Sequence, residues 1–526
     1  MDNPFLQRAE LQLLGGSPGE ALRTARMGLT LFADHSPLLE LAAACAASEG
    51  DDEYAVACWQ RRLELEAVDA STWNSLGLAL ERLQRTADAE MAYRQGLASS
   101  PDEAALHANF GMLLERTGRL AEAEHHQRRA LQLAPDSAEL HSNLAGLLLK
   151  LGQEAAAESL YRAAIRLQPG FAMAHSNLGV LLVDSGRQVE AEAAFREALA
   201  MQPDFLTARM NLGQLLLMQG RLAEGWPLYE GRQYVYLDGG SGPMVHRPAC
   251  PQWQGEALAG KAIIVMPEQG LGDEIQFVRY LAWLKAQGPV RLTLVCRPNQ
   301  QALLQTLDGP DCVLSLKEAA TALDSHDYWT FLLSLPLHAG TTLATVPCAI
   351  PYLHPEPARQ ARFAPLLAGD GLRVGLVWRG NPKHLNDAER SLPALEVLAP
   401  LWTVPGVRFF SLQKSETALS WPEGLPLTDL GPAIGDFADT AAFLSQLDLL
   451  IAVDTSVAHL AGALGLPCWL ILPCYKTDWR WLQQRSDSPW YPSMRLFRQQ
   501  QRGDWQAPVG ELLQALRRFM ESASGG

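Results

Sequence analysis

Long apolar runs and clustered cysteines are both missing from this sequence of 526 residues. No stretch approaches the roughly 18 consecutive apolar residues that a membrane-spanning helix needs. The first residues, Met1 to Phe5, lack the basic and apolar regions of a signal peptide. The eight cysteines are scattered and form no CxxC pair, which favours reduced thiols over disulfides or a zinc site. We therefore expect a cytoplasmic protein without a membrane span.

An excess of positive charge is missing as well, because the formal net charge is -15 at pH 7. This charge argues against a general nucleic-acid binder. Hydrophobic residues make up 48% of the chain, which suits ordinary globular packing. The chain is too long for one hydrophobic core, so we expect about three domains.

A 34-residue period dominates residues 1–238. One column contains prolines, a second contains glycines, a third small residues and a fourth mostly aromatic residues: Pro101, Pro135, Pro169 and Pro203; Gly118, Gly152, Gly186 and Gly220; Gly77, Gly111, Ala145, Gly179 and Gly213; Tyr93, Gln127, Tyr161, Phe195 and Tyr229. Two short helices per 34 residues are typical of tetratricopeptide repeats, which stack into a superhelix. The sequence therefore predicts an all-α array of six to seven repeats.

One column of the array invites a functional interpretation: Asn109, Asn143, Asn177 and Asn211. Asparagine is unfavourable inside a helix, so its presence at the same position of four repeats needs an explanation. The surrounding segments, such as 107–111, resemble the repeats of the O-linked N-acetylglucosamine transferases. That resemblance implies that the four side chains hold the main chain of a polypeptide acceptor. The alternative is that each asparagine satisfies a neighbouring helix.

The period breaks over residues 225–260. The segment Gly239-Gly240-Ser241-Gly242-Pro243 is rich in turn formers, and we assign 239–260 to a linker. Aromatic residues before it, Trp226 and Tyr229 among them, indicate that the last helix packs against the next domain.

Residues 261–368 have an α/β pattern that starts with an apolar strand at 262–266. A glycine loop, 267–272, leads from this strand into a helix, and further strands are expected at 291–295, 312–316 and 328–333. Asp273 lies at the start of that helix, facing the crevice where α/β sheets bind ligands. Its structural alternative is a helix cap.

A second α/β pattern covers residues 369–505. After the strand 373–378, the loop 379–393 contains Lys383 and Arg390, which suit phosphates; the alternative is a solvated loop. The apolar strand 449–453 precedes Asp454, Thr455 and Ser456, all good residues to begin a helix. Such a helix start directs free N–H groups into the ligand crevice, although a plain capped βαβ unit has the same pattern. A last helix near 506–520, in the segment 506–526, is expected to cross back to the first α/β region.

Three motifs together resemble the ADP-heptose–lipopolysaccharide heptosyltransferases: 269–273, Gly375 to Trp378 with Arg390 to Pro393, and 454–461. This resemblance implies a GT-B fold, in which two Rossmann-like domains face a cleft. The first domain carries the catalytic aspartate, and the second binds a nucleotide-diphosphate sugar. Ser456 stands where that family usually has glycine.

The resemblance also implies an inverting transfer without cofactor or metal. Asp273 takes the acceptor proton, Arg390 and Lys383 bind the diphosphate, and the helix start at Thr455 and Ser456 adds N–H groups. Gly270 and Gly272 allow the donor to approach, while Asp454 and His459 bind its hydroxyl groups. The alternative for His459 is a core histidine, and core packing is expected for Trp378, Trp479 and Trp481.

Three functions remain open at this point. The first is a bacterial glycosyltransferase that acts on a polypeptide held by the repeats. The second is a repeat scaffold for protein–protein interaction whose transferase part has lost its activity. The third is a transferase that acts on a lipopolysaccharide core, against which the peptide-binding character of the repeats argues.

Overall fold

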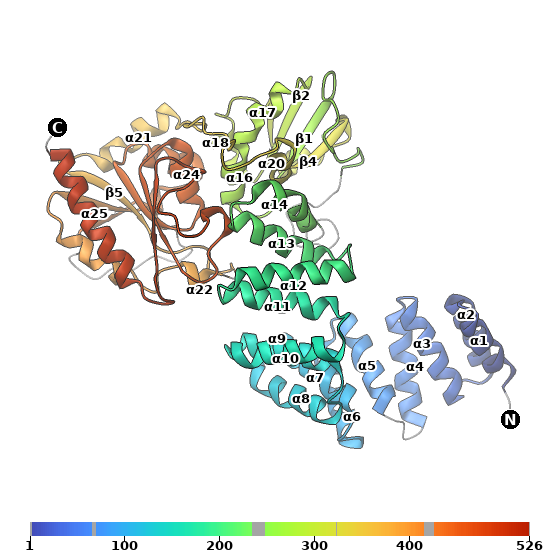
Figure 1. Ribbon diagram of the computed structural model, residues 1–526. Coiled ribbons are helices and arrows are strands. Elements are labelled where there is room, and N and C mark those ends of the chain that lie inside the picture. Colours follow the sequence, from blue (N-terminus) through green and yellow to red (C-terminus); the bar gives the residue numbers. More distant parts are fainter. Residues whose placement is uncertain are drawn as a thin grey trace. The chain divides into compact units, whose positions relative to one another are not determined.

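The computed structural model describes residues 3–65, 70–233, 248–321, 323–384, 386–414 and 425–524. The chain forms two compact units, residues 1–203 and 204–526 (Figure 1). Residues 239–247 of the predicted linker 239–260 lie outside the described residues. Within the described ranges, no helix combines the length and apolar character needed to cross a membrane.

The first unit is built from helices α1 to α12, and α13 and α14 continue the same pattern in the second unit. Most first helices of a pair have 13 residues and most second helices 14: α1 Pro4–Leu14, α2 Pro18–Leu31, α3 Ser36–Ser48, α4 Asp52–Leu65, α5 Ala70–Arg82, α6 Thr86–Ser99, α7 Ala104–Arg116, α8 Leu120–Leu133, α9 Ala138–Lys150, α10 Glu154–Leu167, α11 Ala172–Asp184, α12 Gln188–Met201, α13 Leu206–Met218 and α14 Leu222–Tyr229. These helices confirm the predicted repeats.

The glycine column ends the first helix of each pair. Gly118, Gly152 and Gly186 have φ angles of 80°, 75° and 74°, a left-handed conformation that glycine adopts without steric cost. Gln84 occupies the same repeat position with φ 59°, so one turn of the array carries backbone strain.

The small-residue column lets the two helices of a pair approach each other. A Cβ atom added to Gly77 would lie 2.4 Å from the Tyr93 ring, and one added to Gly179 would lie 2.6 Å from the Phe195 ring. The small and aromatic columns therefore form one contact that recurs through the array.

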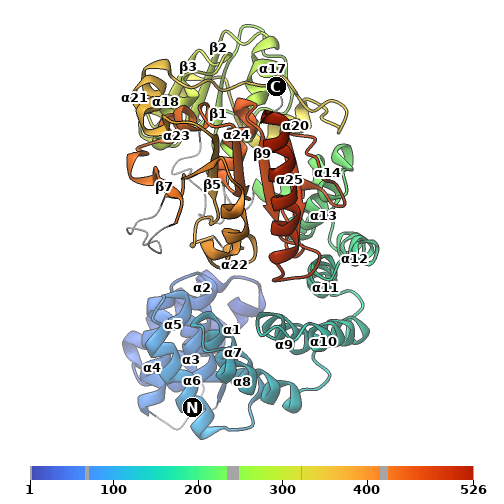
Figure 2. The ribbon, with the colours of Figure 1, turned by 90° about the vertical axis from the view of Figure 1, so that its left-hand side faces the viewer.

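The second unit contains two sheets of parallel strands. The first has the order β3-β2-β1-β4, with β1 Ala262–Met266, β2 Arg291–Cys296, β3 Cys312–Ser315 and β4 Tyr328–Phe331. The second has the order β10-β9-β8-β5-β6-β7, with β5 Leu372–Val377, β6 Val407–Ser411, β7 Leu427–Asp429, β8 Leu449–Val453, β9 Cys468–Leu472 and β10 Met494–Arg498 (Figure 2). The α/β expectation is confirmed.

Short helices connect the strands and bury the central ones. Around the first sheet they are α16 Leu271–Phe277, η2 Val278–Tyr280, α17 Leu281–Ala286, α18 Pro298–Leu304, α19 Leu316–Ala319, η3 Leu323–Ser325, η4 Leu332–Ser334 and α20 Leu335–His338. Around the second they are α21 Pro357–Leu367, α22 Asp387–Arg390, η5 Leu395–Thr403, η6 Gly431–Ala433, α23 Phe437–Leu444, α24 Ser456–Leu464, η7 Trp479–Trp481 and α25 Gln506–Ser524. Every residue of β1, β8 and β9 is buried, as strands covered on both faces require.

The last helix differs from the expectation. Val509, Leu512 and Leu516 of α25 join the core of the second sheet, together with Leu398 of η5. Their spacing puts them on one helix face, and that face finds its apolar partners within the same half. These contacts replace the predicted return to the first α/β region.

The helix α14 and the turn η1, Glu230–Arg232, pack directly on the α/β part. Trp226 and Tyr229 belong to the same buried core as strand residues of both sheets. The Trp226 indole donates a hydrogen bond to the Thr341 carbonyl at 3.1 Å. The predicted packing of the last repeat helix against the next domain is therefore confirmed.

Candidate functional site

Each sheet has one position where consecutive connections leave in opposite directions. In the first sheet this position lies between β1 and β4, and in the second between β5 and β8. Loops that diverge from the carboxyl ends of parallel strands leave a crevice, and ligands bind there in doubly wound folds. The glycine loop after β1, the basic loop after β5 and the segment 454–456 after β8 all start at these positions. The topology thus brings the predicted motifs to the expected edges.

Asp273 lies in the first turn of α16. One carboxylate oxygen accepts the N–H of Gly270 at 2.7 Å, which completes the helix start. The other forms an ion pair with Arg480, and the side chain is 16% exposed. Both oxygens therefore have protein partners, and the role of this carboxylate as a base stays a prediction.

The two glycines of the loop make room for protein groups. A Cβ atom on Gly272 would lie 2.8 Å from a carbon of the His459 ring and 3.5 Å from the Ser456 Cα atom. A Cβ atom on Gly270 would lie 3.0 Å from the Asp273 carboxylate. Gly272 thus lets α16 of the first sheet approach α24 of the second.

Asp478 and Arg480 join the site, although the sequence pattern around them indicated only aromatic packing. Arg480 is 4% exposed. Its guanidinium donates to the Asp478 carboxylate at 3.0 Å and 3.1 Å and to the Gln276 side-chain carbonyl at 2.7 Å, besides the ion pair with Asp273. It therefore connects the loop after β9 to the helix after β1. The available signal was two opposite charges, Asp478 and Arg480, next to tryptophans in the loop that follows a buried strand.

Asp454 follows β8 and is largely buried. Burial and the neighbouring Asp478 carboxylate raise the pKa of Asp454 to about 6, while Arg390 and Arg480 act in the opposite direction. A carboxyl group with such a pKa changes its charge close to neutral pH.

His459 is a core histidine. One ring nitrogen is 3.0 Å from the Tyr491 hydroxyl, and the ring stacks on Trp481 with centroids 5.1 Å apart. The other nitrogen is 3.9 Å from an Asp454 oxygen. Burial, and then Arg480, lower the pKa of His459 to about 3, so the imidazole is neutral at physiological pH. These contacts match the structural alternative for this residue.

Arg390 and Lys383 have different surroundings within the basic loop. Arg390 ends α22, has a side chain 17% exposed, and lies 3.5 Å from an Asp387 oxygen. Its charge is close enough to lower the pKa of His384, after the larger effect of burial. Lys383 is exposed, and its backbone N–H donates to the Asn381 side chain at 3.0 Å. Of the two cations, Arg390 is the one whose charge affects both His384 and Asp454.

Several buried hydrogen-bond donors on the segments that follow β1, β5, β8 and β9 have no acceptor among the residues that the structure describes. They are the Gln276 side-chain amide, the Arg390 Nε, the Thr455 hydroxyl and the Trp479 indole N–H. A buried donor without an acceptor costs roughly 1–3 kcal/mol. Buried donors and arginines on such segments can bind the oxygens of an anionic ligand, phosphate above all.

Backbone strain gathers at the same edge. Gln269, Lys476, Leu482 and Gln484 have φ angles of 49°, 53°, 53° and 58°. Among the described residues other than glycine, Gln84 alone joins them in this region. Such conformations cost about 1–3 kcal/mol each and occur where a site needs its side chains in fixed places. Two strained segments therefore border the Asp273–Arg480 ion pair.

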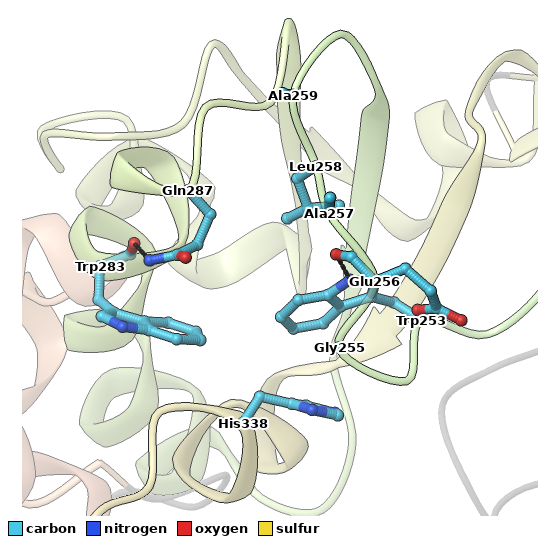
Figure 3. Close-up of a pocket in the computed structure, with 9 residues that line it drawn as sticks. All are labelled: Trp253, Gly255, Glu256, Ala257, Leu258, Ala259, Trp283, Gln287 and His338. Carbon is cyan, nitrogen blue, oxygen red and sulfur yellow. Dashed lines mark hydrogen bonds between the residues drawn. The ribbon is translucent and has the colours of Figure 1, made fainter.

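Cavities elsewhere in the second unit do not involve the predicted residues. One of about 260 Å³ has aromatic walls, Trp253, Trp283 and His338 (Figure 3). Another of about 710 Å³ lies between η5 and the start of α25. Metal ligands are not clustered either: across the described ranges, no group of three or more His, Cys, Asp or Glu side chains is placed to hold an ion.

The asparagine column lies on the first helices of the repeats, and all four side chains are half-buried. Asn109 donates to the Asn74 side-chain carbonyl of α5 at 2.8 Å, so it satisfies a neighbouring helix. The Asn143 amide lies 3.8 Å from the Met112 sulfur. Asn177 and Asn211 belong to different compact units. A role of this column in acceptor binding stays a prediction.

Comparisons with known proteins concern the repeats above all. Residues 74–138, 142–204 and 176–231 match the tetratricopeptide repeat family. Protein FlbA of Caulobacter vibrioides is 29% identical over 330 residues, which are 57% of this chain and 53% of FlbA. The chain thus spans about half the length of that curated relative.

Solved structures that match part of the chain include YrrB, described as a tetratricopeptide repeat protein with an unusual peptide-binding site. It is 21% identical, with a TM-score of 0.30 over 35% of this chain and 95% of YrrB. The anaphase-promoting-complex assembly Cut9–Hcn1 is 20% identical, with a TM-score of 0.36 over 40% of this chain and 42% of that chain. The chain therefore carries tetratricopeptide repeats, followed by an α/β region of parallel sheets.

Proposed function

We propose that the α/β region is a glycosyltransferase of the GT-B type. In this proposal it moves a sugar from a nucleotide-diphosphate sugar to a polypeptide that the repeats hold, with inversion and without a metal. Two groups carry the proposal: Arg390 on the loop after β5, and the buried Thr455 hydroxyl after β8, which has no acceptor among the described residues. The ends of these two strands border the ligand crevice of a doubly wound sheet.

The donor diphosphate binds in the second sheet. Arg390 contributes a charge, and its Nε lies 3.5 Å from an Asp387 oxygen without forming a hydrogen bond to it. The start of α24 adds the Thr455 hydroxyl and the positive end of the helix dipole. These groups stabilise the charge that develops on the diphosphate as it leaves. Lys383 supplements them from the exposed part of the loop.

The transfer forms a bond between the acceptor oxygen and the anomeric carbon, and breaks the bond from that carbon to the diphosphate oxygen. The acceptor proton goes to Asp273, which acts as the general base. Arg480 holds this carboxylate in place through their ion pair. Asp454, which follows β8, binds donor hydroxyl groups.

The acceptor is a polypeptide in the repeat array. Tetratricopeptide arrays present extended concave surfaces, and the amides of Asn143 and Asn177 can both donate to and accept from a main chain. The solved repeat protein YrrB is described as having a peptide-binding site. We place this reaction in the cytoplasm of a bacterium.

A repeat scaffold without transferase activity is the second candidate. The observation in its favour is that both oxygens of Asp273 already have partners in the protein. In that case the repeats bind their partner, and the α/β region binds no sugar nucleotide. A lipopolysaccharide-core acceptor is a third candidate, and no contact in the structure favours it over a peptide.

Calorimetry with a panel of nucleoside diphosphates tests the proposal. We expect one of them to bind, and Arg390→Ala to weaken its affinity by about 1.5–3 kcal/mol, the value of a charged hydrogen bond. Arg495→Ala, an exposed change on β10, is the control and leaves the affinity unchanged. Asp273→Asn should still bind the nucleoside diphosphate, while its rate of sugar transfer should fall by about 10²–10⁴-fold. If the chain binds a peptide but none of the nucleoside diphosphates, the result supports the repeat scaffold instead of the transferase.

A further inference from the structure

The last repeat helix contacts the α/β region through one face. Trp226, Tyr229 and Arg232 follow each other at intervals of three, so their side chains lie on the same side. All three are at most 2% exposed. All three contact the α/β fold, and Tyr229 and Arg232 contact the segment that leads to Asp273.

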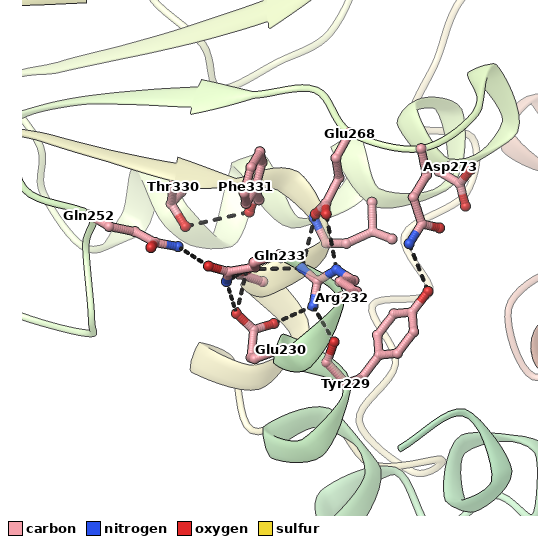
Figure 4. Close-up of polar contacts among 12 residues, drawn as sticks. Tyr229, Glu230, Arg232, Gln233, Gln252, Glu268, Asp273, Thr330 and Phe331 are labelled. Carbon is pink, nitrogen blue, oxygen red and sulfur yellow. Dashed lines mark hydrogen bonds and ion pairs between the residues drawn. The ribbon is translucent and has the colours of Figure 1, made fainter. Parts of the chain in front are cut away.

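Arg232 binds Glu268 near the start of the glycine loop. Its guanidinium donates to both oxygens of Glu268, at 3.0 Å and 2.9 Å, and to the Ser334 hydroxyl at 3.0 Å (Figure 4). Glu268 also accepts the Leu333 N–H at 3.1 Å. The end of β1 is therefore tied to the repeat helix and to the turn after β4.

Tyr229 binds the next residue along the loop. Its hydroxyl accepts a hydrogen bond from the Gln269 side-chain amide at 2.8 Å (Figure 4). Gln269 is one of the strained residues, and Arg297 donates to its carbonyl from the other side. A left-handed conformation in a residue other than glycine persists only where its surroundings hold it. The Tyr229 hydroxyl is one of these holding contacts.

The Tyr229 ring also reaches the partner of Asp273. It packs on Trp479 with centroids 5.9 Å apart, and Trp226 packs on the same indole at 5.5 Å. Trp479 precedes Arg480, whose guanidinium pairs with Asp273. Tyr229 thus contacts the segments on both sides of the Asp273–Arg480 ion pair.

We propose that Tyr229 is a positioning residue, through which the last repeat sets the glycine loop and places Asp273 against Arg480. The catalytic consequence rests on the proposed transferase function. Tyr229 stands at the aromatic position that Tyr93 fills in an inner repeat, where the hydroxyl donates to Glu81 within the array. The final repeat therefore uses a packing position of its family to build a site.

Tyr229→Phe in the full chain tests this inference, with Tyr93→Phe as the matched control. Both changes delete one buried hydroxyl at the same repeat position and keep the ring. Hydrogen exchange followed by mass spectrometry measures the peptide that contains Gly270, whose N–H is bonded to Asp273. We expect its exchange to accelerate about threefold to tenfold in Tyr229→Phe, the effect of one lost hydrogen bond, and not in Tyr93→Phe.

Transfer assays add a second readout. Tyr229→Phe is expected to lower kcat by a similar factor and to leave the affinity for the nucleoside diphosphate unchanged, because that ligand binds in the other sheet. Gln269→Met, which keeps the length of the side chain without its donor, should reproduce the effect and add nothing to Tyr229→Phe.

Equal exchange in the two tyrosine variants would overturn the inference, as would a faster exchange with an unaltered kcat. A wild-type chain that transfers no sugar from any nucleotide refutes the proposed function instead. The exchange comparison still decides in that case whether Tyr229 holds the loop.

Discussion

The buried ion pair between Arg232 and Glu268 makes a large stability effect predictable. Arg232 is 1% exposed and Glu268 is fully buried. Arg232→Met would leave Glu268 without its counter-charge, and breaking a buried pair in this way costs about 3–5 kcal/mol. A second substitution, Glu268→Leu, removes the stranded carboxylate, so the double variant should recover most of the loss.

Urea unfolding followed by tryptophan fluorescence measures this effect in the full chain. Twelve of the 14 tryptophans follow residue 203, so the signal reports mainly on the second unit. Arg221→Met is the control, because the Arg221 side chain is 36% exposed in its pair with Glu224. Surface pairs of this kind contribute at most about 1 kcal/mol.

The pH dependence of the Arg232→Met deficit has a defined sign. Burial raises the pKa of Glu268, and Arg232 opposes this rise. Without Arg232 the folded pKa is higher still, so the charged carboxylate destabilises the fold at high pH, and the penalty fades as pH falls toward the unfolded value near 4.3. The reasoning is refuted if Arg232→Met lowers the free energy of unfolding no more than Arg221→Met does at pH 8. It is also refuted if adding Glu268→Leu to Arg232→Met recovers none of the lost free energy.

Three further predictions concern other parts of the chain. Gln84→Gly should stabilise the repeats by about 1 kcal/mol, because glycine removes the left-handed strain; thermal melting by circular dichroism of the repeat unit shows it. Asp454→Asn should increase the free energy of unfolding at pH 8 by up to about 3 kcal/mol, which a higher melting temperature would show. At pH 3.5 it should have no such effect, because the raised pKa means that the folded protein is destabilised only when Asp454 is charged. A chain that starts at Asp204 should unfold cooperatively, whereas one that starts at Lys261 should aggregate without Arg232 and the aromatic residues of α14.

The repeats were predictable because their rules are local. A glycine with positive φ ends the first helix, and a small residue faces an aromatic ring 16 positions later, as in Gly77 and Tyr93. Both partners recur within each 34-residue unit, so the sequence pattern contains the contact itself. The strands were predictable for a similar reason, since uncharged apolar runs such as 449–453 need cover on both faces.

The candidate site was predictable only in part. Strand ends located Asp273, Arg390 and Asp454 at the crevice edges, because parallel strands of one sheet end on the same side. Arg480 was missed, since its partner Asp273 is 207 positions away and no spacing rule connects them. The path of α25 was also missed, because an apolar helix face does not specify which apolar surface it will meet.

The sequence by itself determined the repeats, the parallel strands and the loops that follow them, since φ preferences and apolar periodicity act over a few residues. Only the tertiary structure decided which groups meet: Arg480 with Asp273, Arg232 with Glu268, and His459 with Tyr491. It also decided the charge states of Asp454 and His459, because burial raises the pKa of the first and lowers the pKa of the second. Desolvation and ion pairing depend on neighbours far away in the chain, and folding alone brings those neighbours together.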